Sequence, residues 1–472
     1  MANKRETYLY EQLAKDLSQA IRQGIFTVDE RLPSLRQTSE QYEVSMATAI
    51  QAYHHLEQEG FIESRPKSGY YVCPWMDDQP EEPVITRPKL SPTVVNIGHL
   101  AMSLVDESRQ PGLIKLGAAV PEPDLLPLGT ISRTLAGVAR RKLLAPAIYE
   151  QAQGSFDLRK QIAQLMRESG VRCTAHDIII TNGCLEALGL ALRSIANEGD
   201  TIAIESPTYF GVLKVIESLG MKVLEIPTHA SNGIELDALE KAIKKRKITA
   251  SVLLPLFNNP LGSTMPDENK RAVVELFNKH NIPLIEDDVY GALSYEPKRP
   301  KAIKAYDESG NVLYCSSFSK TIAPGLRIGW IIAGQHHDQV LYQKFLDNIS
   351  TAIHPQLTMA ELLSHGAYRR CVRHSARVYR LRMEHMRRWV AEFFPIGTRL
   401  SNPQGGYLLW IELPKSIDSF ALYRNAMEKK IAISPGILFS AQGQYQHHIR
   451  LSCGAVEGDQ LRKSIRTLSK LL

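Results

Sequence analysis

A chain of 472 residues is longer than a single hydrophobic core usually serves, so roughly two or three domains are expected. Its composition, 44% hydrophobic and 22% charged residues, is that of a globular protein and gives no reason to expect disorder. The net charge of +6 is small for this length and does not by itself indicate an acidic partner.

The sequence also predicts the cellular setting. No apolar run is long enough to span a membrane, and the polar residues 1–7 lack the apolar core of a signal peptide. The cysteines are scattered and form no Cys-x-x-Cys pair. These features predict a reduced, cytoplasmic setting without a metal site. The six cysteines are Cys73, Cys173, Cys184, Cys315, Cys371 and Cys453.

The first part of the chain, residues 8–73, predicts three helices and a hairpin. Apolar residues recur at helical spacing from Leu9 to Ile21, and a short second helix starts in residues 31–36. Ser45 is a suitable N-cap for a third helix, which Gly60 ends. Two short strands, at 61–62 and 70–72, then flank a basic turn. This order is that of a winged helix-turn-helix.

Such a domain places a helix N-terminus in the major groove of double-stranded DNA and a basic wing beside phosphates. Residues 1–72 contain eight Lys/Arg and ten Asp/Glu, which favours the alternative of a helical module that binds no nucleic acid. The placement of the basic residues favours DNA, because they fall on the turn, the second helix and the wing. They are Arg31, Arg36, Arg65 and Lys67.

Four motifs in this part resemble the GntR-type winged helix, over Leu9 to Val72: Leu-Pro-Ser-Leu-Arg, Val-Ser-x-x-Thr, Ala-Tyr-x-x-Leu-Glu-x-x-Gly-Phe-Ile and Gly-Tyr-Tyr-Val. Many relatives carry an arginine where this chain has Met46, so their base preference does not transfer to this position. The resemblance implies DNA contacts by Arg36, Ser45, Met46, Ala47, Thr48, Ser68 and Gly69.

A change of composition follows at residues 74–112. Residues 77–83 are acidic and proline-rich, and Pro88 and Pro92 follow. Such a composition predicts an extended linker, with residues 94–105 as a candidate short helix that docks on the next domain.

The remainder, residues 113–472, alternates apolar strands with helices. This order predicts an α/β domain with a mostly parallel sheet covered on both faces, and a smaller C-terminal α+β subdomain over about 365–472. The predicted strands are 178–180, 201–204, 222–226, 251–254, 283–285, 312–315 and 328–332.

Polar residues follow the strand ends, where such sheets bind ligands. Lys320 lies in a polar turn with Ser317 before it and Arg327 after it, the parts needed to hold pyridoxal 5'-phosphate (PLP) as a Schiff base. Cys184 and Leu185 open a helix whose amides suit a phosphate. Each residue alone has an ordinary structural explanation, but their combination favours PLP. Tyr209 would stack on the ring, Asp287 would pair with its nitrogen, and Asn259 and Tyr290 would bind its phenolic oxygen.

From about Leu113 onward the chain resembles the fold-type I PLP-dependent aminotransferases, on the motifs Asn-Pro-x-Gly, Glu-Asp-Asp-x-Tyr and Ser-Phe-Ser-Lys-x-x-x-Pro-Gly-Leu-Arg-x-Gly-Trp. The resemblance implies covalent PLP on Lys320 and a homodimer in which Tyr149 reaches the neighbouring subunit's phosphate. It also implies that Arg450 binds a ligand α-carboxylate. Cys184 replaces the small hydroxyl residue common at its position, which removes or weakens one phosphate contact.

The order of the two domains resembles the MocR subfamily of GntR-type transcription regulators. This resemblance implies a PLP-dependent DNA-binding regulator that senses an amino acid or amine. The alternative is an active aminotransferase with an accessory DNA-binding domain. The sequence leaves both open, because all the catalytic parts are present. It identifies neither the effector nor the operator.

Overall fold

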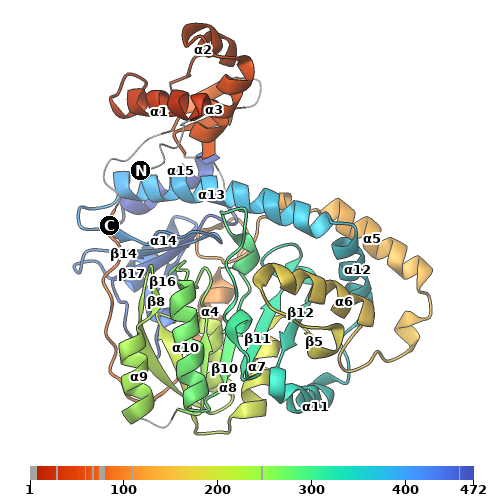
Figure 1. Cartoon of the computed structure of the whole chain (residues 1–472). Helices are drawn as coiled ribbons and strands as arrows, with labels where there is room; N and C mark the ends of the chain where they lie inside the picture. The colour runs from red at the N-terminus through yellow and green to blue at the C-terminus, as the bar shows by residue number, and fades with distance from the viewer. Residues whose placement is uncertain are drawn as a thin grey trace, which may run out of the picture. The chain divides into compact units, whose positions relative to one another are not determined.

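The computed structural model describes residues 8–27, 30–58, 60–65, 68–73, 80–108, 110–245, 248–456 and 458–472. The chain forms two compact units, Met1–Pro80 and Glu81–Leu472 (Figure 1). Within the described residues, no helix combines the length and the apolar character that crossing a bilayer requires.

The first unit has the three helices and the hairpin that the sequence predicts. They are α1 (Leu9–Arg22), α2 (Leu35–Gln41), α3 (Met46–Gln58) and the antiparallel strands β1 (Ile62–Arg65) and β2 (Gly69–Val72). The α2 helix starts later than expected, because Ser34 caps it: its Oγ accepts a hydrogen bond from Gln37 N at 3.3 Å. The Tyr53 hydroxyl donates to Pro33 O at 2.7 Å and lies 2.7 Å from Thr38 Oγ1, which fixes α3 against α2. The wing residue Lys67 lies outside the described residues.

A nine-stranded sheet forms the centre of the second unit. Along the main path the order is β3-β7-β6-β9-β10-β11-β12-β5, and β8 pairs with β7. The strands from β7 to β11 are parallel, whereas β12 runs antiparallel to both neighbours. This is the mostly parallel sheet that the sequence predicts. The strands are β3 (Thr93–Val94), β5 (Ile178–Thr181), β6 (Thr201–Ser206), β7 (Lys222–His229), β8 (Gly233–Ile234), β9 (Ala250–Leu253), β10 (Leu284–Asp287), β11 (Val312–Ser317) and β12 (Gly329–Ile332).

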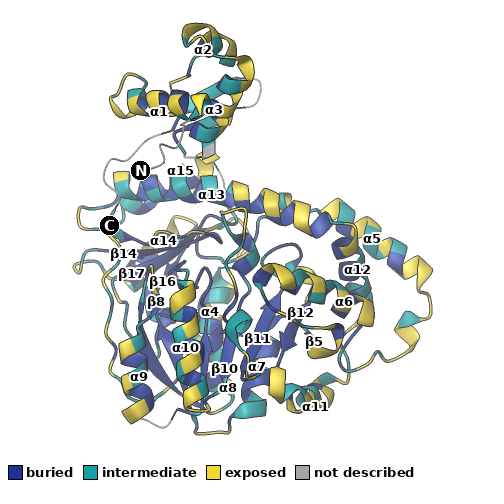
Figure 2. Ribbon diagram, in the orientation of Figure 1, coloured by how far each residue is buried: buried dark blue, intermediate teal, exposed yellow. Residues whose placement is uncertain are grey.

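Helices cover both faces of this sheet, which explains why its central strands are buried and mostly apolar (Figure 2). One apolar cluster joins α7 and α8 to one face, and another joins α9 and α10 to the opposite face. The helices of this unit are α4 (Gly98–Glu107), α5 (Leu128–Arg141), α6 (Phe156–Met166), α7 (Cys184–Ile195), α8 (Phe210–Ser218), α9 (Leu236–Lys245), α10 (Asp267–Lys279), α11 (His337–Asn348), α12 (Ile353–Ser364), α13 (Ala367–Phe393), α14 (Ser419–Glu428) and α15 (Gly458–Ser469).

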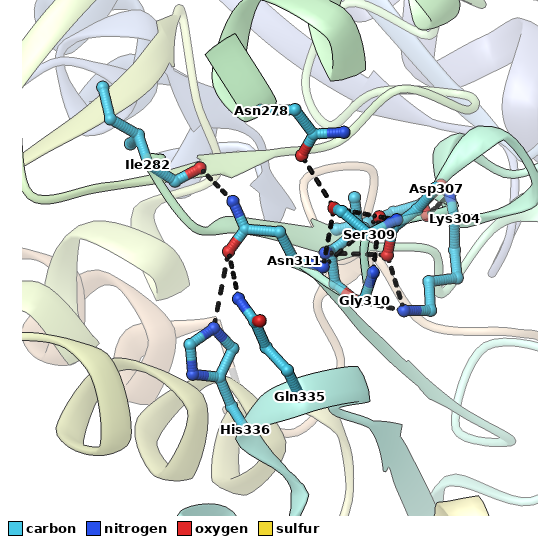
Figure 3. A network of polar contacts seen from close by, with 11 residues as sticks. Asn278, Ile282, Lys304, Asp307, Ser309, Gly310, Asn311, Gln335 and His336 are labelled. Carbon is cyan, nitrogen blue, oxygen red and sulfur yellow. Dashed lines mark hydrogen bonds and ion pairs between the residues drawn. The ribbon is translucent and has the colours of Figure 1, made fainter. Parts of the chain in front are cut away.

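A polar network holds the start of β11, opposite the end that carries the candidate site (Figure 3). The Asp307 carboxylate accepts from Val312 N at 3.0 Å and from Lys304 Nζ at 2.8 Å, and these contacts lower its pKa despite burial. Asn311 donates to Ile282 O at 3.0 Å, next to β10. Because β10 and β11 are fixed where they begin, their far ends are held in register.

The C-terminal part contains a small antiparallel sheet of β13 (Arg399–Leu400), β14 (Leu408–Glu412), β17 (His448–Ser452) and β16 (Ser434–Pro435). Next to it, β4 (Ile114–Lys115) pairs in parallel with β15 (Ile431–Ala432). The chain after β4 stays against these strands, since Gly117 N donates to Ala432 O at 2.7 Å and Ser452 N to Leu116 O at 2.6 Å.

The structure differs from the linker expected over residues 74–112. Residues 81–108 belong to the second unit: β3 pairs with β7, and α4 buries Ala101 and Leu104. The Glu217 carboxylate accepts from Gly98 N at 2.9 Å and so caps α4. Their proline-rich composition predicts no hydrophobic core of their own, but in the structure these residues pack on the core of the second unit. The docked short helix is confirmed, and residues 74–79 lie outside the described part.

Candidate coenzyme and ligand site

The candidate site lies at the carboxyl ends of the parallel strands. Cys184 begins α7 just after β5, Asp287 ends β10, and Ser317 ends β11. Asn259 follows β9 and is buried. Because these strand ends share one edge of the sheet, residues from four separate parts of the sequence converge there.

Lys320 is a half-buried amine in the turn after β11. Its Nζ donates to Ala119 O at 2.7 Å and lies 6.0 Å from the centre of the Tyr290 ring. Burial and the positive charge of Arg450 lower the pKa of Lys320 to about 8. A sizeable neutral fraction at physiological pH makes this amine a nucleophile rather than a solvated charge.

Two neighbouring carboxylates at the end of β10 have different partners. Asp287 accepts a hydrogen bond from Cys184 Sγ at 3.4 Å, and burial raises its pKa to about 6. Asp288 instead accepts from Arg299 Nη2 at 2.5 Å and from the Tyr314 hydroxyl at 2.7 Å. Successive side chains of an extended strand point to opposite faces, so only Asp287 faces Cys184 at the start of α7.

An anion-binding arrangement lies between the start of α7 and the turn after Lys320. Arg327 donates from Nη1 to Ser319 Oγ at 3.2 Å and from Nη2 to Asn182 O at 2.7 Å. Gly183 has φ +94°, and a Cβ there would lie 2.4 Å from Arg327 Nη2. The close approach therefore requires glycine at this position. Ser317 Oγ accepts from Ser319 N at 3.4 Å. A guanidinium, hydroxyls and a helix N-terminus together suit a phosphate.

Arg450 is a buried guanidinium with neutral partners. Its Nη1 donates to Asn259 Oδ1 at 2.8 Å, and its Nη2 donates to Gly117 O and, at 3.2 Å, to Ser434 Oγ. Across the part of the chain that the structure describes, no carboxylate lies within ion-pair distance of it. Burial lowers the pKa of Arg450. A buried charge without a counterion is unfavourable, so this position suits an anionic ligand group.

The three tyrosines predicted for the site lie in different surroundings. Tyr290 is buried, and its ring meets the edge of Tyr407 at 5.6 Å between centres. Tyr209 is half-buried at the start of α8, with its ring 4.8 Å from that of Phe210. Tyr149 is 80% exposed and is therefore much more accessible than Tyr290 or Tyr209. Leu185 is also exposed, which leaves its backbone amide as the group of interest.

Sequence reasoning missed the residues that come from the chain after β4. The carbonyl of Gly117 reaches Arg450, and that of Ala119 reaches Lys320 and accepts from the Tyr407 hydroxyl at 3.3 Å. A Cβ on Gly117 would lie 2.5 Å from the carbonyl carbon of Ile433, so only glycine fits there. The glycine was visible in the sequence, but nothing local indicated its distant partner.

The residues that the sequence predicts for DNA lie on the first unit. Arg36 is exposed, with Nε 3.1 Å from Glu40 Oε1. Ser45 Oγ accepts from Thr48 N at 3.1 Å at the start of α3, where Met46 and Ala47 are exposed. At the wing, the hydroxyls of Ser68 and Tyr71 lie 2.6 Å apart. Gly69 has φ +113°, and a Cβ there would meet Arg31 Nε at 2.9 Å.

The raised pKa of Asp287 predicts a pH-dependent effect on stability. Because the folded state binds this proton more tightly than the unfolded state, the ionised carboxylate destabilises the coenzyme-free fold most at high pH, by about 2–3 kcal/mol at pH 7.5. Asp287→Asn is therefore expected to raise the free energy of unfolding at pH 7.5, with about half this gain at pH 5. Urea titrations at both pH values check this, with the exposed Asp338→Asn as control. An equal gain at both pH values would contradict the assignment.

The two units match two known protein families. Residues 9–72 match the bacterial regulatory proteins of the gntR family, which carry a DNA-binding domain. Residues 145–468 match the aminotransferases of class I and II, a PLP-dependent family.

Relatives and solved structures agree with these matches. The HTH-type transcriptional regulator YjiR of Escherichia coli is 37% identical over 98% of both chains, and the regulator YdcR of the same organism is 34% identical over 98% of both. The structure of a kynurenine aminotransferase from Pyrococcus horikoshii superimposes with a TM-score of 0.74 at 28% identity, covering 79% of this chain and 93% of that one. The chain therefore belongs to the MocR-type family of HTH regulators, in which a GntR-type winged helix precedes a PLP-dependent aminotransferase-like domain.

Proposed function

We propose that this protein regulates transcription by binding double-stranded DNA through its first unit, and that an amino acid or amine reacting at Lys320 changes that binding. The observation that carries the proposal is Lys320 itself, a half-buried amine with a pKa lowered to about 8. It lies among a buried carboxylate, a buried arginine that forms no ion pair with any described residue, and a turn suited to an anion, in a chain that also carries a winged helix. A DNA-binding regulator of this kind acts in the cytoplasm.

The residues present fit PLP. Lys320 would hold it covalently, and Arg327, Ser317 and the amides of Cys184 and Leu185 would hold its phosphate. Asp287 would face the ring nitrogen, where a bound positive charge would favour its ionised form. When bound, PLP supplies an electrophilic carbon and an electron-withdrawing ring. Tyr209 would stack on the ring, while Asn259 and Tyr290 would donate toward its phenolic oxygen.

Arg450 would select ligands that carry a carboxylate. A carboxylate offers two acceptors to a guanidinium, whereas Gly117 and Asn259 each offer one neutral oxygen. Such a ligand would compete with the Gly117 carbonyl for Nη2. The ligand's amino group would take the place of Lys320, which would then be released as a free amine.

The chain after β4 would connect ligand binding at Arg450 and Lys320 to the rest of the protein. The Gly117 and Ala119 carbonyls bind the two cations that a ligand would approach, Arg450 and Lys320. Ligand binding would therefore release two contacts of one segment, residues 117–119. That segment follows directly on residues 81–113, which connect it along the chain to the DNA-binding unit. A ligand that favours the released arrangement would shift the DNA-binding equilibrium.

Exposed apolar side chains on the second unit support a homodimer. Leu143, Leu144 and Ile148 are exposed beside Tyr149, and α11 exposes Tyr342, Phe345 and Leu346. Exposed apolar residues in groups are typical of protein interfaces. In a dimer, Tyr149 of one copy would reach the phosphate site of the other. A molar mass of two chains by light scattering supports this arrangement, and a mass of one chain contradicts it.

The proposal is tested by titrating the PLP-loaded protein on its operator DNA with a panel of amino acids and of the corresponding amines. DNA affinity and the absorbance of the lysine-bound coenzyme are measured in the same samples. The expected result is that ligands which change the absorbance also change the DNA affinity. Ligands that change the absorbance while DNA affinity stays constant across the whole panel would refute it.

The second candidate function is transamination with the winged helix as an accessory domain. It is favoured by the complete set of groups around Lys320, including the buried Asp287 and Arg450. Steady conversion of an amino acid and a keto acid, well above the rate with free PLP, would support it. A single turnover that stops when Lys320 is displaced favours the sensor.

A further inference from the structure

The outer face of α3 is uncharged and partly apolar. Residues 46–53 contain no Lys, Arg, Asp or Glu. Met46 is 43% exposed and Ile50 37% exposed, and they lie one turn apart on the same face, as do Ala47 and Gln51. Figure 2 shows this exposed side of α3, the helix labelled in Figure 1. Two large apolar side chains side by side on a surface helix suggest a contact with another molecule.

The opposite face of α3 holds the helix firmly in its unit. Ala49, Ala52 and Leu56 are fully buried, and Tyr53 is hydrogen-bonded to α2 and to Pro33 O. The apolar pair Met46 and Ile50 therefore has a fixed orientation.

Two exposed arginines near α3 favour a polyanion as the partner, although the first unit as a whole carries more acidic than basic residues. Arg31 is exposed and lies against the wing at Gly69, and Arg36 is exposed on α2. Arg36 has a surface ion pair with Glu40 at 3.1 Å, a contact weak enough to be exchanged for a phosphate. An uncharged helix face flanked by cations suits the major groove, where bases lie between two rows of phosphates.

The side chains on this face then decide which bases they read. Within the major groove, the apolar group on a base edge is the 5-methyl of thymine, which suits Met46, Ala47 and Ile50. The Ser45 and Thr48 hydroxyls are engaged with each other at 2.8 Å. Gln51 makes no side-chain hydrogen bond to any described residue, so its amide is available for the N6/N7 edge of adenine.

We propose that α3 reads A·T base pairs, with Met46, Ala47 and Ile50 against thymine methyl groups and Gln51 on adenine. This inference rests on the proposed DNA-binding function and specifies the class of sequence that the protein recognises. Recognition is mainly apolar at these positions, so specificity arises from methyl contacts rather than from arginine–guanine pairs.

The test removes single methyl groups from the DNA. Operators are first selected from a random library with the full-length, PLP-loaded protein, and each thymine of a half-site is then replaced by deoxyuridine. Affinity is expected to fall about fourfold at each contacted thymine, which corresponds to the burial of one methyl group. The double variant Met46→Ala/Ile50→Ala should lose this sensitivity. Ile25→Ala, which truncates another exposed isoleucine outside α3, should keep it.

A second variant should change the preferred base instead of removing the sensitivity to thymine methyl groups. Met46→Arg should select guanine where the wild type selects thymine, because arginine pairs with guanine in a bidentate manner. Selection of G·C-rich half-sites by the wild type, or equal affinity for thymine and deoxyuridine operators, overturns the inference while leaving DNA binding intact. A change in molar mass without a change in base preference for the double variant also overturns it, because the face would then bind protein. Failure to select any DNA would overturn the proposed function itself.

Discussion

Lys320→Ala is expected to abolish covalent coenzyme attachment and the response of DNA binding to every ligand, while DNA binding without ligand persists. In the proposed function this amine is the group that holds the coenzyme covalently, and its lowered pKa suits that role. Truncation of the side chain also removes one of the two donors to the Ala119 carbonyl and leaves it the Tyr407 hydroxyl at 3.3 Å. The absorbance of the lysine-bound coenzyme and the DNA affinity, each measured with and without ligand, check the two parts of this result.

The control for this experiment is Lys222→Ala, which removes an exposed lysine from β7. It should keep the coenzyme absorbance and the ligand response. Preserved ligand-responsive DNA binding in Lys320→Ala would show that the signal does not pass through this amine. Because α1 to β2 form a separate compact unit, the loss of basal DNA binding is not expected.

The sequence was informative wherever a functional residue follows a strand directly. Asp287 and Lys320 lie at or after the ends of the parallel strands β10 and β11, whereas Arg327 precedes β12, which is antiparallel and therefore begins at the same edge of the sheet. The two aspartates at the end of β10 point in opposite directions, so that Asp287 contacts Cys184 whereas Asp288 contacts Arg299 and Tyr314.

The sequence was uninformative wherever a residue acts through a distant partner. The sequence predicts for the Cys184 side chain only a weakened or lost phosphate contact, whereas its Sγ donates to Asp287, more than a hundred residues later. Gly117 reaches Arg450 across the whole domain. The linker predicted over 74–112 differs from the structure at residues 81–108 for the same reason, because β3 pairs with β7 and α4 packs on the second unit. Contacts between residues that are distant in sequence cannot be predicted from local composition.

The contacts that Arg450 makes without a ligand suit the proposed sensor, because a ligand carboxylate could replace them. Its partners are a backbone carbonyl, an amide oxygen and a hydroxyl, all neutral. They bind Nη1 and Nη2 but leave the buried Nε without a hydrogen-bond partner, and a carboxylate would bind the guanidinium more strongly. The additional binding free energy from the carboxylate could therefore displace residues 117–119. A permanent carboxylate partner within the chain would remove this difference.

Replacing Arg450 and Arg299 by methionine in separate variants should therefore affect ligand binding in one case and fold stability in the other. Arg450→Met is expected to weaken binding of carboxylate-bearing ligands by about 2–5 kcal/mol, roughly thirtyfold to several thousandfold, with little effect on amines that lack the carboxylate. Arg299→Met should leave ligand selectivity unchanged but destabilise the fold by about 3–5 kcal/mol, because it leaves the buried Asp288 carboxylate without its cation. Arg450→Met should destabilise less, since it leaves no charge unpaired. Ligand titrations and urea unfolding of both variants measure the two effects. Retained discrimination between an amino acid and its amine in Arg450→Met would exclude Arg450 as the carboxylate site.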